Sequence, residues 1–561
     1  MTAAGPSRPR GGLRRLASGS ATLLAVLVVW FALVAPDHPD GLVAAAFLRI
    51  PLEGLVLAGL ALALRGRVRG RVLAGFGVLL GLLTVLKLLD LGSFAVVDRP
   101  FDPLTDWDGL GAALGFLRRS AGGPVAALAV AGAVVLAVAL LVVVPLAVVR
   151  LGRLAASRRR TSTAVAAALA VTWAVTAALG ARVAPGAPLA AAQVVQYAAA
   201  HAGAAEATLR DWRGFDTALA SDRFGGAGNA DLAGLRGKDV LVVFVESYGR
   251  VAVQGPSSTA VQGLLDEQGR GLRAHGWSAR SAFLTSPTFG GVSWLAHATL
   301  QSGVWVDSQS KYDQLVASRH TTLATAFRRA GWRTAALVPS DRGAWPAGHS
   351  FYDYDQVLDG GSLGYAGPPF GFSLMPDQYA LEAFHRLEAA SGNQQPLMAE
   401  VDLASSHGPW APQPVMLDWG SLGNGSVFDG VQARAQSAQA LWQHRQDVPA
   451  AYMTSIEYSL TALVQYIERY GNDNLVVLVL GDHQPATIVS GHDGNHDVPV
   501  TVVARDPSVT RTFAQWGWQE GLRPAPAAPV WRMDAFRDRF LGAFSTPVAE
   551  KAPPATAGRR P

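Results

Sequence analysis

The first third of the chain consists of long apolar runs separated by short polar loops. Five runs are long and apolar enough to cross a hydrocarbon core of roughly 30 Å. They comprise residues 18–36, 41–64, 72–97, 123–149 and 162–182. Arginines precede the first run as in a signal peptide, but four further runs follow it, so we expect a retained anchor. The pattern predicts a five-span transmembrane module over residues 1–182.

Arginine placement predicts the orientation of this module. Arginines gather before the first span, between the second and third, and between the fourth and fifth. The other two loops are acidic or mixed, as in "PDHPDG". Because cytoplasmic loops carry the excess of Lys and Arg, the N-terminus is expected in the cytoplasm. An odd number of spans then places everything after about residue 183 outside the cell. The sequence thus predicts a multi-pass protein of the cell membrane with an extracellular domain.

Two predicted spans contain ionisable residues, which are costly in a bilayer. Arg49 and Glu53 lie four positions apart in the second span, and Lys87 and Asp90 lie three apart in the third. The preferred interpretation is two structural ion pairs, Arg49 with Glu53 and Lys87 with Asp90, that hold helices together. The alternative is a polar pocket for a lipid headgroup.

The pattern changes after the last span. Residues 183–237 form a linker rich in Ala, Gly and Pro that contains a predicted connector helix. From Asp239 onward, buried strands such as "DVLVVFVES", "RTAALVP", "PLMAEVDL", "NLVVLVLGD" and "VPVTVVARD" alternate with helices such as "AAYMTSIEYSLTALVQYIERYG". This order predicts an α/β domain over 238–545, with a mostly parallel sheet sandwiched by helices. Residues 546–561 are expected to form a disordered tail.

The composition excludes several kinds of site and argues against one class of partner. The 561 residues are 50% hydrophobic, and the absence of cysteine excludes disulfides, thiolate metal sites and cysteine nucleophiles. The net charge of +5 arises largely from the loop arginines, so no nucleic-acid partner is expected.

Polar residues stand where the predicted strands end. In a parallel sheet these ends meet at one edge, where ligands bind. Carboxylates and imidazoles together suit a divalent cation such as Mn²⁺, Zn²⁺ or Mg²⁺. The residues are Glu246, Ser247, Asp341, Arg342, Ser405, Ser406, His407, Asp482, His483, His492, Asp493, His496 and Asp497.

Four motifs, "VESYG", "SWLAHATLQSG", "SSHGPW" and "LVLGDHQP", resemble in sequence and order the sulfatase-like branch of the alkaline phosphatase superfamily. Lipoteichoic acid synthase and related membrane phosphoglycerol or phosphoethanolamine transferases are the most similar members. The resemblance implies an alkaline phosphatase-like fold and one divalent metal ion, Mn²⁺ first, with Zn²⁺ or Mg²⁺ as alternatives. It implies Glu246, Asp482 and His483 as metal ligands. His407 and His496 would hold phosphate oxygens or a second metal.

The nucleophile implied by the resemblance is a hydroxyl at the start of a helix. Ser293 fits this position and would also bind the metal, while Thr288 is the alternative. Ser293 also fits a plain helix-capping role. Leu295 and His297 stand where sulfatases need Pro and Arg, so conversion to formylglycine is not expected.

Substrate recognition in the synthases uses a Trp closely followed by an Arg. This sequence has Trp345, but its arginine, Arg342, precedes it. Both are candidate substrate-binding residues. His297 and His349 either line the same pocket or have a structural or surface role.

These observations predict a phosphoglycerol, or related headgroup, transferase that forms a phospho-Ser intermediate in cell-envelope polymer synthesis. Its donor would be a membrane phospholipid, and its acceptor an envelope polymer or glycolipid. The alternatives are an extracytoplasmic phosphoester or sulfate-ester hydrolase, and a receptor or scaffold on a decayed domain.

Overall fold

The computed structural model describes residues 10–184, 187–226, 230–343, 345–389, 392–393, 395–492 and 494–546. The chain divides into two compact units. We call Met1–Ala95, Arg99–Leu104 and Ala127–Arg210 the helical unit, and Val96–Asp98, Thr105–Ala126 and Asp211–Pro561 the sheet unit. The tail predicted to be disordered lies outside the described residues, apart from Thr546.

Among the described residues, four helices are long and apolar enough to cross a membrane. They are α1 (Arg10–Val34), α3 (Gly66–Val97), α5 (Gly123–Ser157) and α6 (Arg159–Ala178). The predicted span 41–64 contains a 3₁₀ turn at Ala44–Leu48 and the 12-residue helix α2 (Leu52–Ala63). Alone, α2 is shorter than the roughly 20 residues that a spanning helix needs. The count of five spans therefore stays a prediction.

The ion pair predicted within the third span is wrong. Lys87 Nζ instead donates a hydrogen bond of 2.8 Å to the carbonyl oxygen of Ala35. Asp90 Oδ2 accepts from the Tyr197 hydroxyl at 2.5 Å and lies 2.9 Å from His201 Nε2. Both groups are buried, and these bonds to distant segments partly offset the cost of removing them from water.

The pair predicted within the second span is also wrong. Glu53 Oε1 accepts from the backbone N–H of Val195 at 2.9 Å. Glu53 Oε2 and Arg49 Nε are buried and have no hydrogen-bond partner within the described part of the chain. Arg49 precedes α2 in extended backbone, so the helical spacing that the prediction assumed does not exist there.

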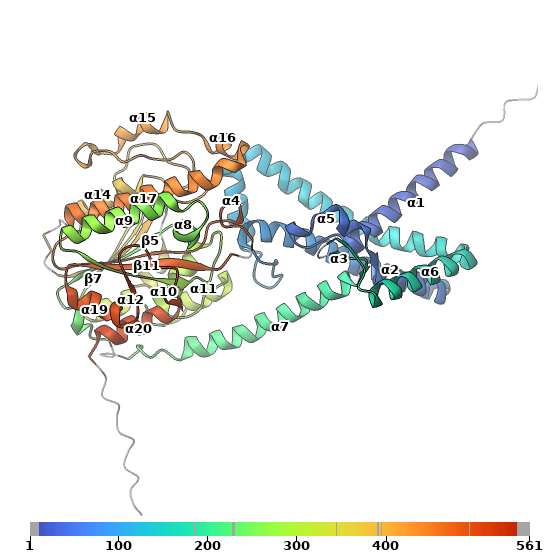
Figure 1. Ribbon diagram of the computed structural model, residues 1–561, viewed down its shortest axis with the longest axis horizontal. Coiled ribbons are helices and arrows are strands. Elements are labelled where there is room, and N and C mark those ends of the chain that lie inside the picture. Colours follow the sequence, from blue (N-terminus) through green and yellow to red (C-terminus); the bar gives the residue numbers. More distant parts are fainter. Residues whose placement is uncertain are drawn as a thin grey trace, which may run out of the picture. The chain divides into compact units, whose positions relative to one another are not determined.

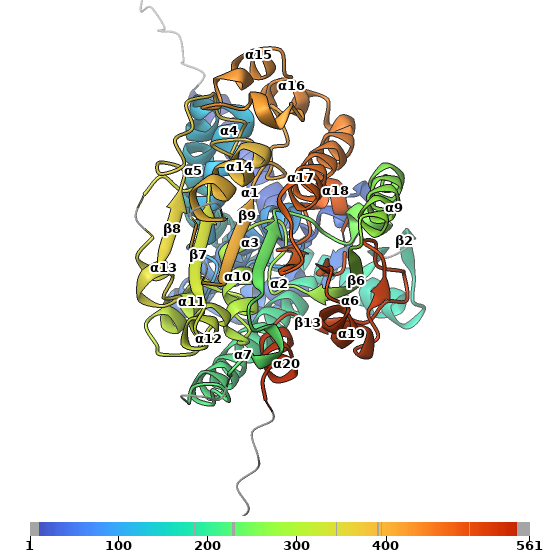
Figure 2. The same cartoon turned by 90° about the vertical axis from the view of Figure 1, so that its left-hand side faces the viewer.

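Among its described residues, the sheet unit contains nine strands, in the order β12-β6-β11-β10-β5-β9-β7-β8 with β13 beside β6. Five neighbours, β10, β5, β9, β7 and β8, run parallel, and β11 is antiparallel to β10. Figure 2 shows β8, β7 and β9 side by side in this order. The predicted mostly parallel α/β fold is confirmed. The strands are β5 (Asp239–Val245), β6 (Ser278–Thr285), β7 (Arg333–Val338), β8 (Gln356–Asp359), β9 (Leu397–Leu403), β10 (Leu475–Gly481), β11 (Asp497–Ala504), β12 (Gln519–Glu520) and β13 (Val530–Arg532).

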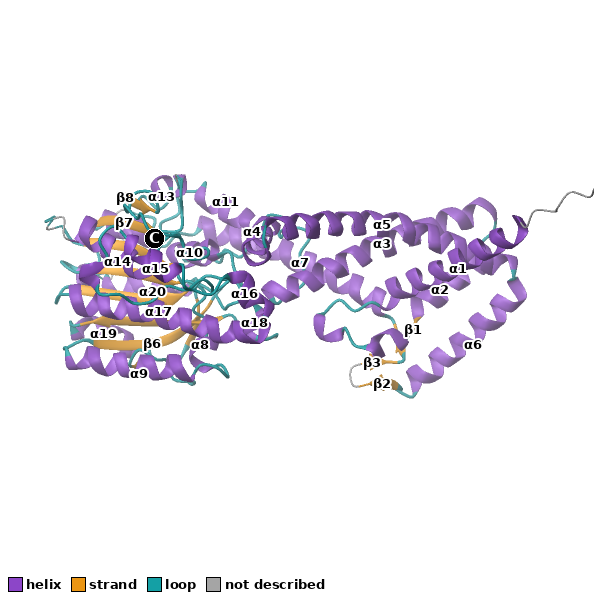
Figure 3. Cartoon of the chain, turned by 90° about the horizontal axis from the view of Figure 1, so that it is seen from above, coloured by secondary structure: helices purple, strands orange, loops and turns teal. Residues whose placement is uncertain are grey.

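Helices cover both faces of this sheet (Figures 1 and 3). One face carries α9 (Thr259–Ala274), α14 (Asp377–Phe384) and α17 (Val448–Tyr470). The other carries α10 (Ser293–Ser302), α12 (Leu323–Arg329), α19 (Pro507–Gln515) and α20 (Ala535–Phe544). Strands buried on both faces need apolar side chains at every position, which explains the continuous run in β5. A long connecting helix, α7 (Gln193–Ala220), precedes the sheet in the chain.

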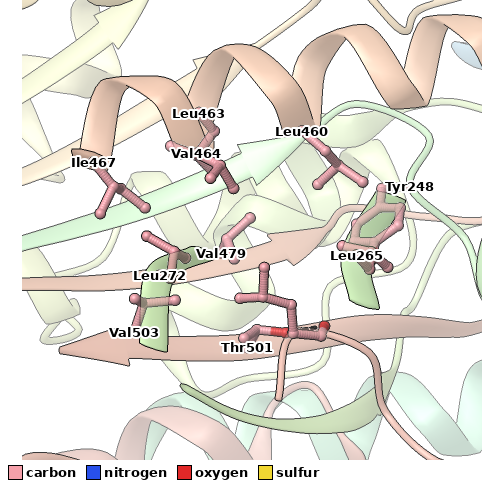
Figure 4. Close-up of a pocket in the computed structure, with 11 residues that line it drawn as sticks. Tyr248, Leu265, Leu272, Leu460, Leu463, Val464, Ile467, Val479, Thr501 and Val503 are labelled. Carbon is pink, nitrogen blue, oxygen red and sulfur yellow. Dashed lines mark hydrogen bonds between the residues drawn. The ribbon is translucent and has the colours of Figure 1, made fainter. Parts of the chain in front are cut away.

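A small cavity of about 20 Å³ lies between α17, α9 and the sheet. Figure 4 shows the side chains that line it. Leu463, Val464 and Val479 are among its lining side chains, and nearly all of them are apolar. The volume is about that of one water molecule, so no substrate fits there. The cavity is a packing feature of the core.

We expect Leu463→Ala to destabilise the sheet unit by about 2–5 kcal/mol. Leu463 is only 2% exposed, and truncation enlarges the existing cavity because the surrounding strands cannot collapse into it. The measurement is the thermal unfolding midpoint of the detergent-solubilised protein. Leu463→Met keeps the volume and should cost less than about 1.5 kcal/mol. Equal midpoints for both variants would contradict this account of the packing.

Candidate active site

Strand register brings two candidate metal ligands together. Val245, the last residue of β5, pairs with Gly481, the last residue of the parallel strand β10. Glu246 and Asp482 follow these residues directly, so the two carboxylates leave the sheet at neighbouring positions of one edge. The backbone N–H of Ser247 donates to Asp482 Oδ1 at 2.7 Å and ties the two strand ends together.

His483 completes a compact group of ligand atoms. Its Nε2 lies 3.4 Å from Glu246 Oε1 and 3.7 Å from Asp482 Oδ2. Its Nδ1 lies 2.8 Å from the carbonyl oxygen of Gln484, which fixes the ring orientation. One ligand atom from each of the three residues lies within 4.8 Å of the others. Asp482 Oδ2 is buried without a hydrogen-bond partner in the described chain. An orphaned carboxylate oxygen beside an imidazole is a donor set that fits a divalent cation.

Charge within this cluster shifts its pKa values strongly. Burial raises the pKa of Asp482 to about 6, and the charge of Glu246 acts in the same direction. Burial alone would lower the pKa of His483, but the carboxylates of Asp482 and Glu246 raise it to about 9. Burial would also raise the pKa of Glu246, yet His407 and His483 hold it well below its usual range. Without a cation, the cluster therefore retains a proton on His483 at neutral pH.

Ser293 is the first residue of α10, and its hydroxyl faces the cluster. Its Oγ donates to Glu246 Oε2 at 2.8 Å and lies 3.2 Å from His483 Nε2. The capping position belongs to Val292, so the plain capping role for Ser293 is wrong. Val292 has a left-handed φ of 57°, which costs a β-branched residue roughly 1–3 kcal/mol. Such strain is typical of functional turns, and here it aims the start of the helix at the cluster.

Thr288 lies nearby but makes no such contact. Its Oγ1 is 3.4 Å from Ser286 Oγ, and that hydroxyl donates to the carbonyl oxygen of Asp482 at 2.5 Å. Among the described residues, no hydrogen bond joins Thr288 to a ligand side chain. Geometry therefore favours Ser293 over Thr288.

The two histidines expected to hold phosphate oxygens come from two loops near the cluster. His407 follows β9, the neighbour of β5, and its ring stacks on Phe372 with 3.7 Å between ring centroids. His496 precedes β11, the neighbour of β10, and its ring lies 5.4 Å from that of Phe289. Its carbonyl oxygen accepts from the N–H of Ser286. Asp493, in the same motif as His496, lies outside the described residues.

Trp345 and Arg342 do not join the cluster. Trp345 packs on Tyr352 and Tyr354, with ring centroids 5.2 and 6.1 Å apart. Arg342 is exposed in the turn after β7. No contact links either residue to the ligand side chains within the described chain. Substrate binding by this pair remains a prediction with no direct geometric support.

A second cluster lies inside the domain, and only one of its members was singled out from the sequence. His297 Nδ1, one turn after Ser293 on α10, is 3.1 Å from Glu400 Oε1 and 3.6 Å from Asp402 Oδ1. Burial raises the pKa of Asp402 to about 8. The sequence feature that indicates this cluster is "AEVDL", in which two carboxylates two positions apart share one face of an otherwise buried strand.

Asp377, at the start of α14, holds the loop that carries His407. Its Oδ1 accepts from the N–H of Ser405 at 2.9 Å, and its Oδ2 accepts from the Ser459 hydroxyl at 2.6 Å. Burial raises the pKa of this carboxyl to about 6 despite these bonds. Ionising Asp377 therefore costs more in the folded protein than in the unfolded chain.

This shift predicts a pH-dependent difference between the wild type and Asp377→Asn. Between about pH 4 and 6 the folded state holds a proton that the unfolded state has released, so wild-type stability falls as pH rises. The free energy of unfolding of the wild type falls by about 3 kcal/mol in total, at about 1.4 kcal/mol per pKa unit. The amide does not titrate, so the unfolding midpoint of the variant should rise relative to that of the wild type as the pH increases over this range. A midpoint difference that stays constant from pH 4 to 7 would contradict the prediction.

No family model matches the chain, and no curated protein matches it. Among solved structures, the lipoteichoic acid synthase LtaP from Listeria monocytogenes is 16% identical, with 58% of this chain and 79% of that chain covered and a TM-score of 0.35. The periplasmic domain of the phosphoethanolamine transferase EptC from Campylobacter jejuni is 12% identical, with 55% and 89% covered and a TM-score of 0.35. The corresponding Escherichia coli domain, in complex with Zn, is 12% identical, with 52% and 77% covered and a TM-score of 0.33.

These neighbours belong to the alkaline phosphatase superfamily, the group that the sequence motifs resemble.

Proposed function

We propose that this chain is a membrane-anchored, metal-dependent transferase of the alkaline phosphatase superfamily, which moves phosphoglycerol or a related headgroup from a phospholipid to an acceptor alcohol. The observation that supports this most is the Ser293 hydroxyl, 2.8 Å from Glu246 in a cluster with an orphaned buried carboxylate oxygen. A hydroxyl nucleophile next to a cation site is what phosphoryl transfer needs. The apolar helices of the helical unit suit a lipid donor.

Glu246, Asp482 and His483 would hold the cation, and their oxygen and nitrogen donors suit Mn²⁺ or Zn²⁺. When bound, it would supply Lewis-acid neutralisation of the negative charge on the phosphoryl oxygens. The second cation considered from the sequence would have His407 and His496 as its protein ligands.

Each of the site residues has a separate role in a two-step transfer. Ser293 Oγ forms a bond to phosphorus, and the bond from phosphorus to the diacylglycerol oxygen breaks. The serine proton, which Ser293 Oγ donates to Glu246 Oε2 in the structure, ends on the released diacylglycerol hydroxyl. His407 and His496 orient the phosphoryl oxygens. In the second step an acceptor hydroxyl displaces Ser293, which regains its proton.

The orientation predicted from the loop arginines is part of this proposal. With the N-terminus in the cytoplasm, the sheet unit would act outside the cell on the outer leaflet. The acceptor would then be an envelope polymer or a glycolipid.

The purified full-length protein should be incubated with headgroup-labelled phosphatidylglycerol and Mn²⁺. We expect diacylglycerol release and label on an added acceptor alcohol. If water receives all of the label at saturating acceptor, the protein is a hydrolase. If no diacylglycerol forms with Mn²⁺, Zn²⁺ or Mg²⁺, the proposal is wrong.

A further inference from the structure

Helix α4 (Gly109–Ala121) belongs to the sheet unit, although it lies in the loop between the third and fourth predicted spans. The Phe116 ring packs edge-on against Trp442 of α16 (Ala438–Gln443), with centroids 5.4 Å apart. Figure 1 shows α4 and α16 next to each other. Phe116 also covers Gly408, where an added Cβ would lie 3.0 Å from its ring. The helix is therefore packed against the loop that carries His407.

This packing brings Arg119 close to the candidate active site. Its guanidinium lies 4.9 Å from the ring centroid of Phe372, and the same ring stacks on His407. The Phe372 ring therefore contacts both Arg119 and His407. This series of contacts links α4 to His407, which follows the strand beside the one that ends at Glu246.

Arg119 is available to bind a ligand. Its side chain is exposed, and no carboxylate pairs with it in the described part of the chain. A guanidinium stays protonated at any physiological pH and offers five N–H donors. It also covers the Phe372 ring, where a substrate ammonium would otherwise gain a cation–π contact.

We propose that Arg119 is a specificity-determining residue, which selects phospholipid headgroups that are neutral or anionic over headgroups that carry an ammonium. The inference rests on the transferase function proposed above. A hydroxyl oxygen of a glycerol headgroup accepts hydrogen bonds from the guanidinium. An ammonium is repelled by it and finds the Phe372 ring covered. Glycerol-type headgroups therefore fit this site, and ethanolamine-type headgroups do not.

The test compares kcat/KM of the full-length protein for phosphatidylglycerol and phosphatidylethanolamine in matched mixed micelles. We expect the wild type to prefer phosphatidylglycerol. Arg119→Ala should lower kcat/KM for this lipid about 10- to 100-fold, the loss of a charge-assisted hydrogen bond, mainly through KM. Arg119→Glu should reverse the preference, and Arg119→Lys should retain part of it. Arg118→Ala is the matched control, since Arg118 is an exposed neighbour on the same helix and should leave the ratio unchanged.

Three outcomes would overturn the inference. The first is a wild type that prefers phosphatidylethanolamine. The second is an Arg119→Glu variant with an unchanged ratio of the two kcat/KM values. The third is an equal loss of kcat on both lipids, which would place Arg119 in the catalytic step or in folding. A wild type that is inactive on both lipids would instead refute the proposed function itself.

Discussion

Ser293→Ala is expected to lower kcat for phospholipid turnover by at least about a thousandfold, because it removes the nucleophile on which both steps depend. The substitution deletes one oxygen atom and its 2.8 Å hydrogen bond to Glu246, and it leaves the helical backbone of α10 intact. Metal binding by Glu246, Asp482 and His483 should persist. The measurements are diacylglycerol release and calorimetric titration with Mn²⁺.

Thr288→Ala is the matched control for this prediction. Thr288 is buried nearby, but its hydroxyl bonds to Ser286 rather than to a ligand side chain. We expect kcat within a few-fold of the wild type. Label from the lipid headgroup, trapped by acid quenching, should map to the peptide that contains Ser293. Full turnover by Ser293→Ala with loss in Thr288→Ala would reverse the assignment.

The fold could be predicted largely because β5, β9 and β10 are buried on both faces. Such strands leave uninterrupted apolar runs in the sequence, and each run ends where the strand ends. Strand β6 escaped prediction because its first half, "SARS", is mostly polar and pairs with the short edge strand β12. The direction of β11 could not be read from its composition, because antiparallel and parallel strands in a covered sheet are equally apolar.

The site was predictable for a related reason. Glu246 and Asp482 directly follow apolar strands, so sequence position alone places them at one sheet edge. Glu400 and Asp402 lie inside β9, where the sequence pattern predicts a strand and no site. Arg119 could not be found from the sequence, since nothing local indicates that α4 packs against the loop of His407. The ion pairs predicted from spacing within spans failed because each charged group found a partner far away along the chain, or none.

Asp482→Asn is expected to weaken binding of Mn²⁺ or Zn²⁺ by at least about 100-fold, since it removes a charged ligand. Loss of a residue that only hydrogen-bonds to a metal ligand already weakens binding by about 10- to 100-fold. The amide keeps the shape of the side chain, and one of its atoms can still accept from the N–H groups of Ser247 and His483 at 2.7 Å. The orphaned Oδ2 position then becomes an NH₂ group, which cannot bind a cation. Calorimetric titration of the full-length protein measures this directly, without any activity assay.

The same titration has a pH dependence with a definite sign. A cation needs His483 neutral and Asp482 ionised, yet their pKa values are raised to about 9 and about 6. Affinity should therefore rise by up to tenfold per pH unit between about pH 6 and pH 9, and more steeply below about pH 6, with proton release on binding. Asp402→Asn is the matched control, because Asp402 belongs to the second cluster, with His297 and Glu400. The Asp402→Asn variant should bind the cation with an affinity within a few-fold of that of the wild type. Loss of binding in Asp402→Asn with retention in Asp482→Asn would move the cation to that second cluster and leave Ser293 without its proposed activation.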